Sequence, residues 1–309
     1  MRRRRRWPWL VMVSVLALAA AALSVPQVRS FVTHWGGSPT RTWPLEPYAV
    51  GNEPLLRLAA VGDVGHPGGR EQATAAAMAR AADGRPFEAL VLLGDNAYRE
   101  GDPAGLDQTV FGPFAPLLDA GAQLWPILGN HDIMDGHAAA NVDALGMPGR
   151  WYAKQLDNLL FVALDSNDLN SDQLAWLDDV LAESDATWKI IALHHPPYSA
   201  GYQGSSPEAR RLVSPIAERH GVQLVLSGHE HDYERSRAIN GVTYIVSGAG
   251  SETRRTGHQD FTAAAWSWHH FLDISIYADR LVVRAVNQDV RVFDEVTIRA
   301  EAPGPSESG

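Results

Sequence analysis

Six short apolar segments between residues 55 and 230 are the feature that most limits how this chain can fold. They are Leu55–Val61, Ala89–Leu93, Leu124–Leu128, Leu159–Leu164, Lys189–Leu193 and Val222–Leu226. Each has the length of a β-strand, and helical patterns lie between them over residues 70–82, 171–181 and 207–220. Four later apolar runs, at 242–246, 271–277, 281–286 and 291–298, indicate a strand meander. The pattern predicts an α/β domain over residues 55–300, a two-sheet β-sandwich flanked by helices.

Five of the six segments are followed by side chains of the types that bind metal ions. In chain order these side chains are Asp63, Asp95 and Tyr98, Asn130, His131 and Asp132, His194 and His195, and His229 and His231. Only the fourth segment, which ends at Asp165-Ser166, adds no clear ligand. Ligands bind outside the carboxyl ends of strands in open α/β sheets, so these side chains are expected to converge at one edge.

Each of these motifs has an ordinary structural explanation when it is taken alone. An Asp after a strand is often a turn residue or a helix cap, and a single His often lies in the core. Five such motifs in order on successive strands are not independent accidents, and together they predict a metal site. The chain has no cysteine, which excludes a disulfide framework, a thiol nucleophile and thiolate ligands. The site must therefore use oxygen and imidazole ligands.

The motifs that contain these residues resemble those of a known enzyme group. The motifs GDVG, GDNAY, GNHD, IALH and GHEH occur in this order between Gly62 and His231. They are similar to the motifs of the calcineurin-like metallophosphoesterases and, within these, most similar to those of the purple acid phosphatases. The resemblance implies the calcineurin-like fold. It also implies a binuclear metal centre that hydrolyses phosphate monoesters by attack of a metal-bound hydroxide.

The resemblance also implies which residues hold the two ions. The first ion would be held by Asp63, Asp95, Tyr98 and His231. The second would be held by Asp95, Asn130, His194 and His229, with Asp95 as the bridge. Most of the superfamily begins with Asp-x-His, whereas Gly65 occupies the His position here, so that Tyr98 would supply the missing ligand. A phenolate among carboxylates favours Fe(III) at the first position, and the second ion would be divalent Fe, Zn or Mn.

Two further residues are candidates for the catalytic machinery. His131 would protonate the leaving oxygen or stabilise its charge, and Asp132 would orient His131 or support the shell behind it. The substrate would be a phosphorylated small molecule or a nucleotide. A phosphodiesterase, or a nucleotide or cell-envelope phosphatase, on the same site is the alternative. A non-catalytic, membrane-tethered interaction module is a weaker alternative. A site that had lost its activity should also have lost at least one metal ligand, whereas the ligand set here is intact.

The charge distribution separates the N-terminus from the rest of the chain. Arg2–Arg6 precede the apolar run Trp7–Val25, which indicates a signal peptide or a membrane-anchor helix over residues 1–30. A linker at 31–54 and a disordered tail at 301–309 would flank the catalytic domain. The chain after residue 30 has 20 Lys and Arg against 36 Asp and Glu, a net charge of −16. Nucleic-acid binding is therefore not expected, and the domain would be extracytoplasmic, either anchored or secreted.

Overall fold

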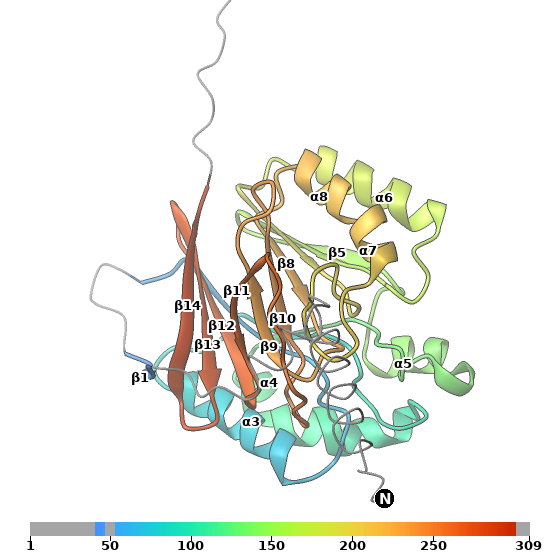
Figure 1. Cartoon of the computed structure of the whole chain (residues 1–309). Helices are drawn as coiled ribbons and strands as arrows, with labels where there is room; N and C mark the ends of the chain where they lie inside the picture. Colours follow the sequence, from blue (N-terminus) through green and yellow to red (C-terminus); the bar gives the residue numbers. More distant parts are fainter. Residues whose placement is uncertain (1–40, 47–52, 301–309) are drawn as a thin grey trace, which may run out of the picture.

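The computed structural model of the chain describes residues 41–46 and 53–300, which contain two facing β-sheets with helices outside them (Figure 1). The first sheet has seven strands. Their order is β1 (Trp43–Pro44), β14 (Arg291–Arg299), β13 (Arg280–Asn287), β12 (His270–Ile276), β2 (Leu56–Val61), β3 (Ala89–Leu92) and β4 (Gln123–Pro126). Strands β2, β3 and β4 are parallel, and the C-terminal meander joins them through the antiparallel pair β12–β2.

The second sheet also has seven strands. Their order is β11 (Thr262–Trp266), β9 (Tyr233–Ser236), β10 (Thr243–Ser247), β8 (Leu224–Ser227), β7 (Trp188–Ala192), β6 (Leu159–Ala163) and β5 (Tyr152–Leu156). Strands β6, β7, β8 and β10 pair in parallel, whereas β5 and β9 run antiparallel to their neighbours. Each sheet therefore has a parallel group of strands whose carboxyl ends lie at one edge.

Helices cover the outer faces of the sandwich (Figure 1). Helices α3 (Gly69–Ala81) and α4 (Gly112–Asp119) pack with the first sheet, and α6 (Ser171–Ala182), α7 (Pro207–Leu212) and α8 (Ser214–Arg219) with the second. Helix α5 (Ala138–Ala144) lies between β4 and β5 in the sequence. Short helical turns occur at Pro103–Gly105, Asp107–Phe111 and Met134–Gly136.

Strand β6 shows why the apolar segments are continuous rather than alternating. Leu159 and Phe161 belong to the core between the sheets, whereas Leu160 and Val162 pack against the outer helices. Phe161 meets Trp125 of the facing sheet with ring centroids 5.0 Å apart. Because both faces of this strand are buried, every position is apolar. The predicted sandwich of two sheets with flanking helices is thus confirmed.

The predicted helix over residues 207–220 is wrong in one respect, because the structure divides it into α7 and α8. The break falls at Val213, directly before the Ser214-Pro215 start of α8. A proline inside a helix lacks a donor for the carbonyl four residues earlier, and its ring clashes with that carbonyl. Pro215 is accepted only because it stands in the first turn of a new helix.

The predicted signal or anchor segment at residues 1–30 and the tail at 301–309 lie outside the described residues, as does most of the linker at 31–54. In the part of the chain that the structure describes, no helix is both long enough and apolar enough to cross a membrane.

Candidate metal centre

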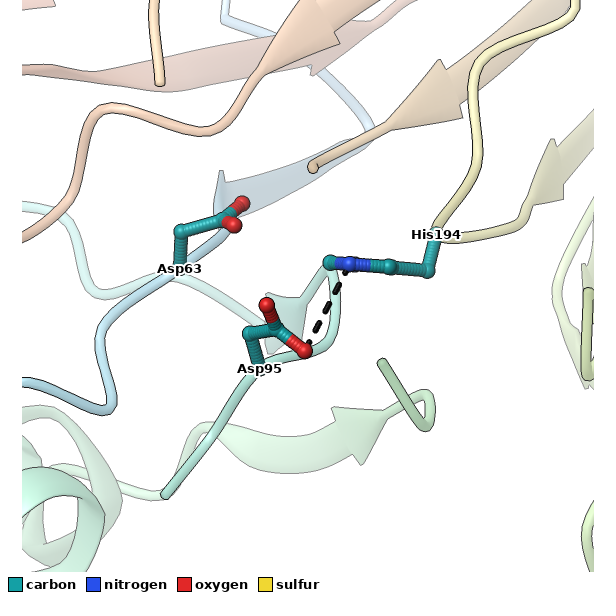
Figure 2. A group of neighbouring side chains, drawn as sticks. All are labelled: Asp63, Asp95 and His194. Carbon is teal, nitrogen blue, oxygen red and sulfur yellow. Dashed lines mark ion pairs between the residues drawn. The ribbon is translucent and has the colours of Figure 1, made fainter. Parts of the chain in front are cut away.

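The predicted ligands meet where the carboxyl ends of the two parallel strand groups face each other. Strands β2 and β3 of the first sheet lead to Asp63 and Asp95, and β7 of the second sheet leads to His194. Figure 2 shows the imidazole of His194 reaching across to the two carboxylates. One donor atom from each of these three buried residues lies within 4.8 Å of the others.

A first group of donor atoms surrounds the hydroxyl of Tyr98. Its Oη lies 3.1 Å from Oδ1 of Asp63, 3.0 Å from Oδ2 of Asp95 and 3.2 Å from Nε2 of His231. The His231 Nε2 lies 3.3 Å from Oδ1 of Asp63. The first predicted set, Asp63, Asp95, Tyr98 and His231, is therefore assembled. His66 is not part of it, since its half-exposed ring lies 3.6 Å from Glu252.

A second group of donor atoms surrounds the side-chain oxygen of Asn130. Its Oδ1 lies 3.0 Å from Nδ1 of His229 and 3.2 Å from Nε2 of His194, and these two nitrogens are 3.2 Å apart. The His194 Nε2 is also 3.5 Å from Oδ1 of Asp95. Asp95 thus presents one carboxylate oxygen to each group, as expected for the shared ligand.

The spacing and chemistry of these atoms fit a pair of metal ions. With bonds of about 2.0–2.2 Å, neighbouring ligands of one ion stand roughly 3 Å apart or slightly more. Asp63 and Asp95 are 0% and 2% exposed, and their ion-pair partners in the described chain are His231 and His194 rather than lysine or arginine. Buried carboxylates need such compensation, and bound cations supply it.

The loops that carry the ligands combine unusual backbone conformations with close packing at the preceding glycines. Asp63, Asp95 and His229 have φ angles of 59°, 53° and 70°, a region that few non-glycine residues occupy and that is common at functional sites. At Gly129 an added Cβ would lie 2.1 Å from Oδ1 of Asp95, and at Gly94 it would lie 2.5 Å from Nδ1 of His194. Asp95 therefore occupies the space that a side chain at position 129 would fill, and His194 occupies the space that a side chain at position 94 would fill.

The electrostatics of the site favour cations. Burial acts to raise the pKa of Asp95, but the neighbouring His194 outweighs it and holds that pKa well below its usual range. Burial acts to lower the pKa of His194, but the charge of Asp95 raises it to about 10. Burial and the two carboxylates raise the pKa of Tyr98 far above its ordinary value. A bound metal ion would replace the protons that His194 and Tyr98 hold in its absence, because ligand atoms must be deprotonated to bind a metal.

A backbone contact prepares His194 for this role. Its Nδ1 lies 2.8 Å from the carbonyl oxygen of Leu93. An Nδ1–H that donates to this carbonyl leaves Nε2 unprotonated and turned toward Asn130 and Asp95. Such outer hydrogen bonds fix the tautomer of metal-binding histidines.

His131 lies at the border of the two donor groups. Its backbone N–H donates to Oδ1 of Asp95 over 2.9 Å, and its half-buried ring packs edge-on against Tyr98 with centroids 4.6 Å apart. The ring Nδ1 is 2.6 Å from the carbonyl oxygen of Arg99. Arg99 O thus orients the ring and leaves Nε2 as the nitrogen that can meet a substrate.

Asp132 supports the loops behind the ligands. Its carboxylate accepts hydrogen bonds from the backbone N–H groups of Asn96 and Gly129 over 2.9 and 2.8 Å, and a further one from the Asn96 amide. Burial and the charge of Asp95 raise its pKa to about 7. Of the two roles expected for Asp132, these contacts correspond to loop support, while the ring of His131 is oriented by Arg99.

The end of β6, which offered no ligand in the sequence, supplies supporting residues. The Oγ of Ser166 lies 2.9 Å from Nδ1 of His195, whose ring is 4.5 Å from that of His229. Asn167 donates from its amide to the carbonyl of Gly129 over 3.2 Å. The only sequence signal was their place at the carboxyl end of a strand.

Comparisons with known proteins agree with this arrangement. The profile of the calcineurin-like phosphoesterase family matches residues 56–233, which include every donor described above. Tartrate-resistant acid phosphatase type 5 of the rabbit (Oryctolagus cuniculus) is 29% identical over 249 residues, covering 67% of this chain and 76% of that protein.

Two solved structures share the fold. Purple acid phosphatase PPD1 from yellow lupin (Lupinus luteus) seeds is 18% identical with a TM-score of 0.71, covering 82% of this chain and 55% of that one. GAP50, the anchor in the inner membrane complex of Plasmodium, is also 18% identical with a TM-score of 0.72, covering 81% of this chain and 90% of that one.

Proposed function

Because this chain belongs to the calcineurin-like phosphoesterase family, we propose that it hydrolyses phosphate monoesters at a metal centre of the purple acid phosphatase type. It is a metal-dependent phosphoesterase, and its relatives include acid phosphatases. The proposal of a purple acid phosphatase type of centre depends on one observation, the position of Tyr98. Its hydroxyl lies 3.0–3.2 Å from Asp95, Asp63 and His231, where it completes one donor group.

The donor chemistry supports different ions in the two groups. Tyr98 with two carboxylates and His231 is a hard, anionic set that suits Fe(III). Asn130 with His194 and His229 is a more neutral set that suits a divalent ion such as Fe, Zn or Mn. Two bound ions supply charge that offsets the phosphate and lower the pKa of the attacking water. A protein nucleophile is therefore not needed.

The chain's own residues contribute orientation and a proton. The carboxylate of Asp95 ties the two donor groups together, and the backbone N–H of His131 holds it in place. With Nδ1 of His131 turned to the carbonyl of Arg99, Nε2 can carry a proton to the leaving oxygen of an ester. Hydrolysis of a monoester depends most on this proton when the alcohol is a poor leaving group.

Hydrolysis of two nitrophenyl esters tests the proposal. We expect the protein, loaded with iron and zinc, to hydrolyse p-nitrophenyl phosphate with a kcat/KM at least tenfold above that for bis-p-nitrophenyl phosphate. The metal-free protein is the matched control and should be inactive. Faster hydrolysis of the diester would point to a phosphodiesterase on the same site. Full metal loading without turnover of either ester would indicate a non-catalytic module.

Export is the second part of the proposal. The five arginines followed by the apolar run to Val25 support an extracytoplasmic domain that is anchored or secreted. Mass spectrometry of the N-terminus of the protein recovered from cells distinguishes the two forms. A chain that keeps Trp7–Val25 in the membrane fraction is anchored, and one that begins after the apolar run is secreted. Recovery of the intact chain from the cytoplasm would contradict export.

A further inference from the structure

The two histidines that face the buried carboxylates differ in how their second ring nitrogen is held. The Nδ1 of His194 lies 2.8 Å from the carbonyl oxygen of Leu93. His231 turns its Nε2 to the first donor group, and its Nδ1 is buried without a hydrogen-bond partner among the described residues. Once Nε2 of His231 binds a metal ion, the ring proton must be on Nδ1. An acceptor for this proton is therefore needed behind His231.

The carboxylate of Glu252 lies where this acceptor is needed. Its Oε2 is 3.5 Å from Nδ1 of His231. The side chain of His231 is 4% exposed, whereas that of Glu252 is 46% exposed and free to adjust. The distance exceeds that of an ordinary N–H···O hydrogen bond by a few tenths of an ångström, which a small rotation of the Glu252 side chain closes. The carboxylate can thus accept the Nδ1 proton while it keeps its contact with water.

Backbone hydrogen bonds tie the turn that carries Glu252 to two ligands of the first donor group. Ser251 donates from its backbone N–H to the carbonyl of Asp63 over 3.1 Å, and from its Oγ to the same carbonyl over 2.5 Å. On the other side of Glu252, the backbone N–H of Arg254 donates to the carbonyl of His231 over 2.7 Å. The position of Glu252 relative to His231 is therefore set by the fold of the site itself.

The second oxygen of the Glu252 carboxylate faces His66. Its Oε1 lies 3.6 Å from Nε2 of His66, whose ring is half-exposed. The two carboxylate oxygens thus face different histidines, one on the surface and one among the ligands. This arrangement keeps Oε2 on the side of His231.

From these contacts we propose that Glu252 is a positioning residue for the first ion. Its carboxylate accepts the Nδ1 proton of His231, orients the ring and stabilises the trivalent state of the ion that the ring holds. The proposal rests on the iron centre proposed above. Acidic partners of metal-binding histidines fix the tautomer and raise the basicity of the nitrogen that binds the metal. A more basic nitrogen and a nearby negative charge stabilise Fe(III) more than Fe(II), because Fe(III) has the higher charge.

Two substitutions separate the charge of Glu252 from its hydrogen bond. Glu252→Gln keeps an acceptor oxygen but removes the charge, and Glu252→Ala removes both. In the iron-loaded protein, Glu252→Gln should weaken the binding of Fe(III) about tenfold more than that of Fe(II), which raises the reduction potential by about 59 mV. The visible phenolate band should move to longer wavelength, because an Fe(III) ion with weaker donors accepts charge from the phenolate at lower energy. Glu252→Ala should also lower the affinity for zinc, loaded in place of iron, by about 10–100-fold.

Glu100→Gln is the matched control, because it removes one exposed carboxylate two residues after Tyr98. The contact of Glu100 with Nδ1 of His137 uses its backbone carbonyl rather than the carboxylate. This variant should leave the potential, the band and the zinc affinity unchanged. An equal shift of the potential in Glu100→Gln and Glu252→Gln would reduce the effect to distant charge and overturn the proposal. A wild-type potential and band in both Glu252 variants would overturn it as well.

The measurements also separate this proposal from the one on which it rests. If the iron-loaded wild-type protein has no visible phenolate band, the assignment of Fe(III) to the first donor group fails. Zinc binding, measured by competition with a chelator, then decides the role of Glu252 without reference to iron or to turnover. Equal zinc dissociation constants for wild type and Glu252→Ala would refute that role, and a rise of tenfold or more in the variant would support it.

Discussion

Replacement of Tyr98 by phenylalanine tests the assignment of the first donor group in two independent ways. The Tyr98 hydroxyl lies 3.1 and 3.0 Å from one oxygen each of Asp63 and Asp95, both buried. A hydrogen bond to a charged group contributes about 1.5–3 kcal/mol. We therefore expect Tyr98→Phe to lower the free energy of unfolding of the metal-free protein by about this amount. With a urea m-value of about 3 kcal/mol/M, the midpoint would fall by roughly 0.5–1 M.

The same variant has a spectroscopic consequence in the iron-loaded protein. A phenolate bound to Fe(III) gives a visible charge-transfer band, which Tyr98→Phe should abolish. Tyr202→Phe is the matched control, because that side chain is exposed and should change the unfolding free energy by less than about 0.5 kcal/mol and leave the band intact. An unchanged band in Tyr98→Phe, or an unchanged urea midpoint, would refute the role given to this hydroxyl.

Three further predictions concern the site and its support. His131→Gln should lower kcat/KM for alkyl phosphates by about 10²–10⁴. The loss should be smaller for p-nitrophenyl phosphate, because its leaving group needs no proton. Equal losses for both substrates would contradict a proton transfer from His131. Gly129→Ala places a Cβ 2.1 Å from Oδ1 of Asp95, so kcat/KM should fall about 10²-fold. Gly149→Ala is the control, because its Cβ would lie at an ordinary contact distance of 3.5 Å from the carbonyl oxygen of Trp151, and it should leave kcat/KM unchanged. Burial lowers the pKa of His270 from 6.5 to about 4, so that the unfolded chain binds the proton first as the pH falls. The free energy of unfolding should therefore lose about 3 kcal/mol between pH 6.5 and 4, measured by urea denaturation, and His270→Gln should remove this part of the pH dependence.

The strands that form the site could be predicted from sequence because they are buried on both faces. Strands β3 and β6 are continuous apolar runs, and β2 is apolar apart from the buried Arg57. Each of the three begins and ends within two residues of its predicted bounds. The sequence does not predict strands β1, β5, β9 and β11. The sequences of β5 and β9, YAKQL and YERS, are short and interrupted by polar residues. Their pairing depends on neighbours that are distant in the sequence, which local patterning does not show.

The ligands could be found, but the groups that support them could not. Asp63, Asp95 and His194 each lie two or three residues after the end of a strand, so the order of strands and residue types predicts a metal site. The resemblance to the purple acid phosphatases then implies which residues hold the ions. The position of Asp132 depends on Asn96, which is 36 residues away, and Ser166 matters only because the fold brings His195 beside it. Such contacts are made by loops from different strands, and no spacing in the sequence encodes them.

The number of metal ions bound per chain is the direct measure of a binuclear centre, because the site has two donor groups that share Asp95. Elemental analysis by plasma mass spectrometry after metal loading should give two ions per chain for the wild-type protein. Asp95→Asn should bind one ion or none, whereas Asp119→Asn, at the exposed end of α4, should keep two. A wild-type protein that binds no more than one ion, or an Asp95→Asn variant that keeps both, would contradict a binuclear centre bridged by this carboxylate.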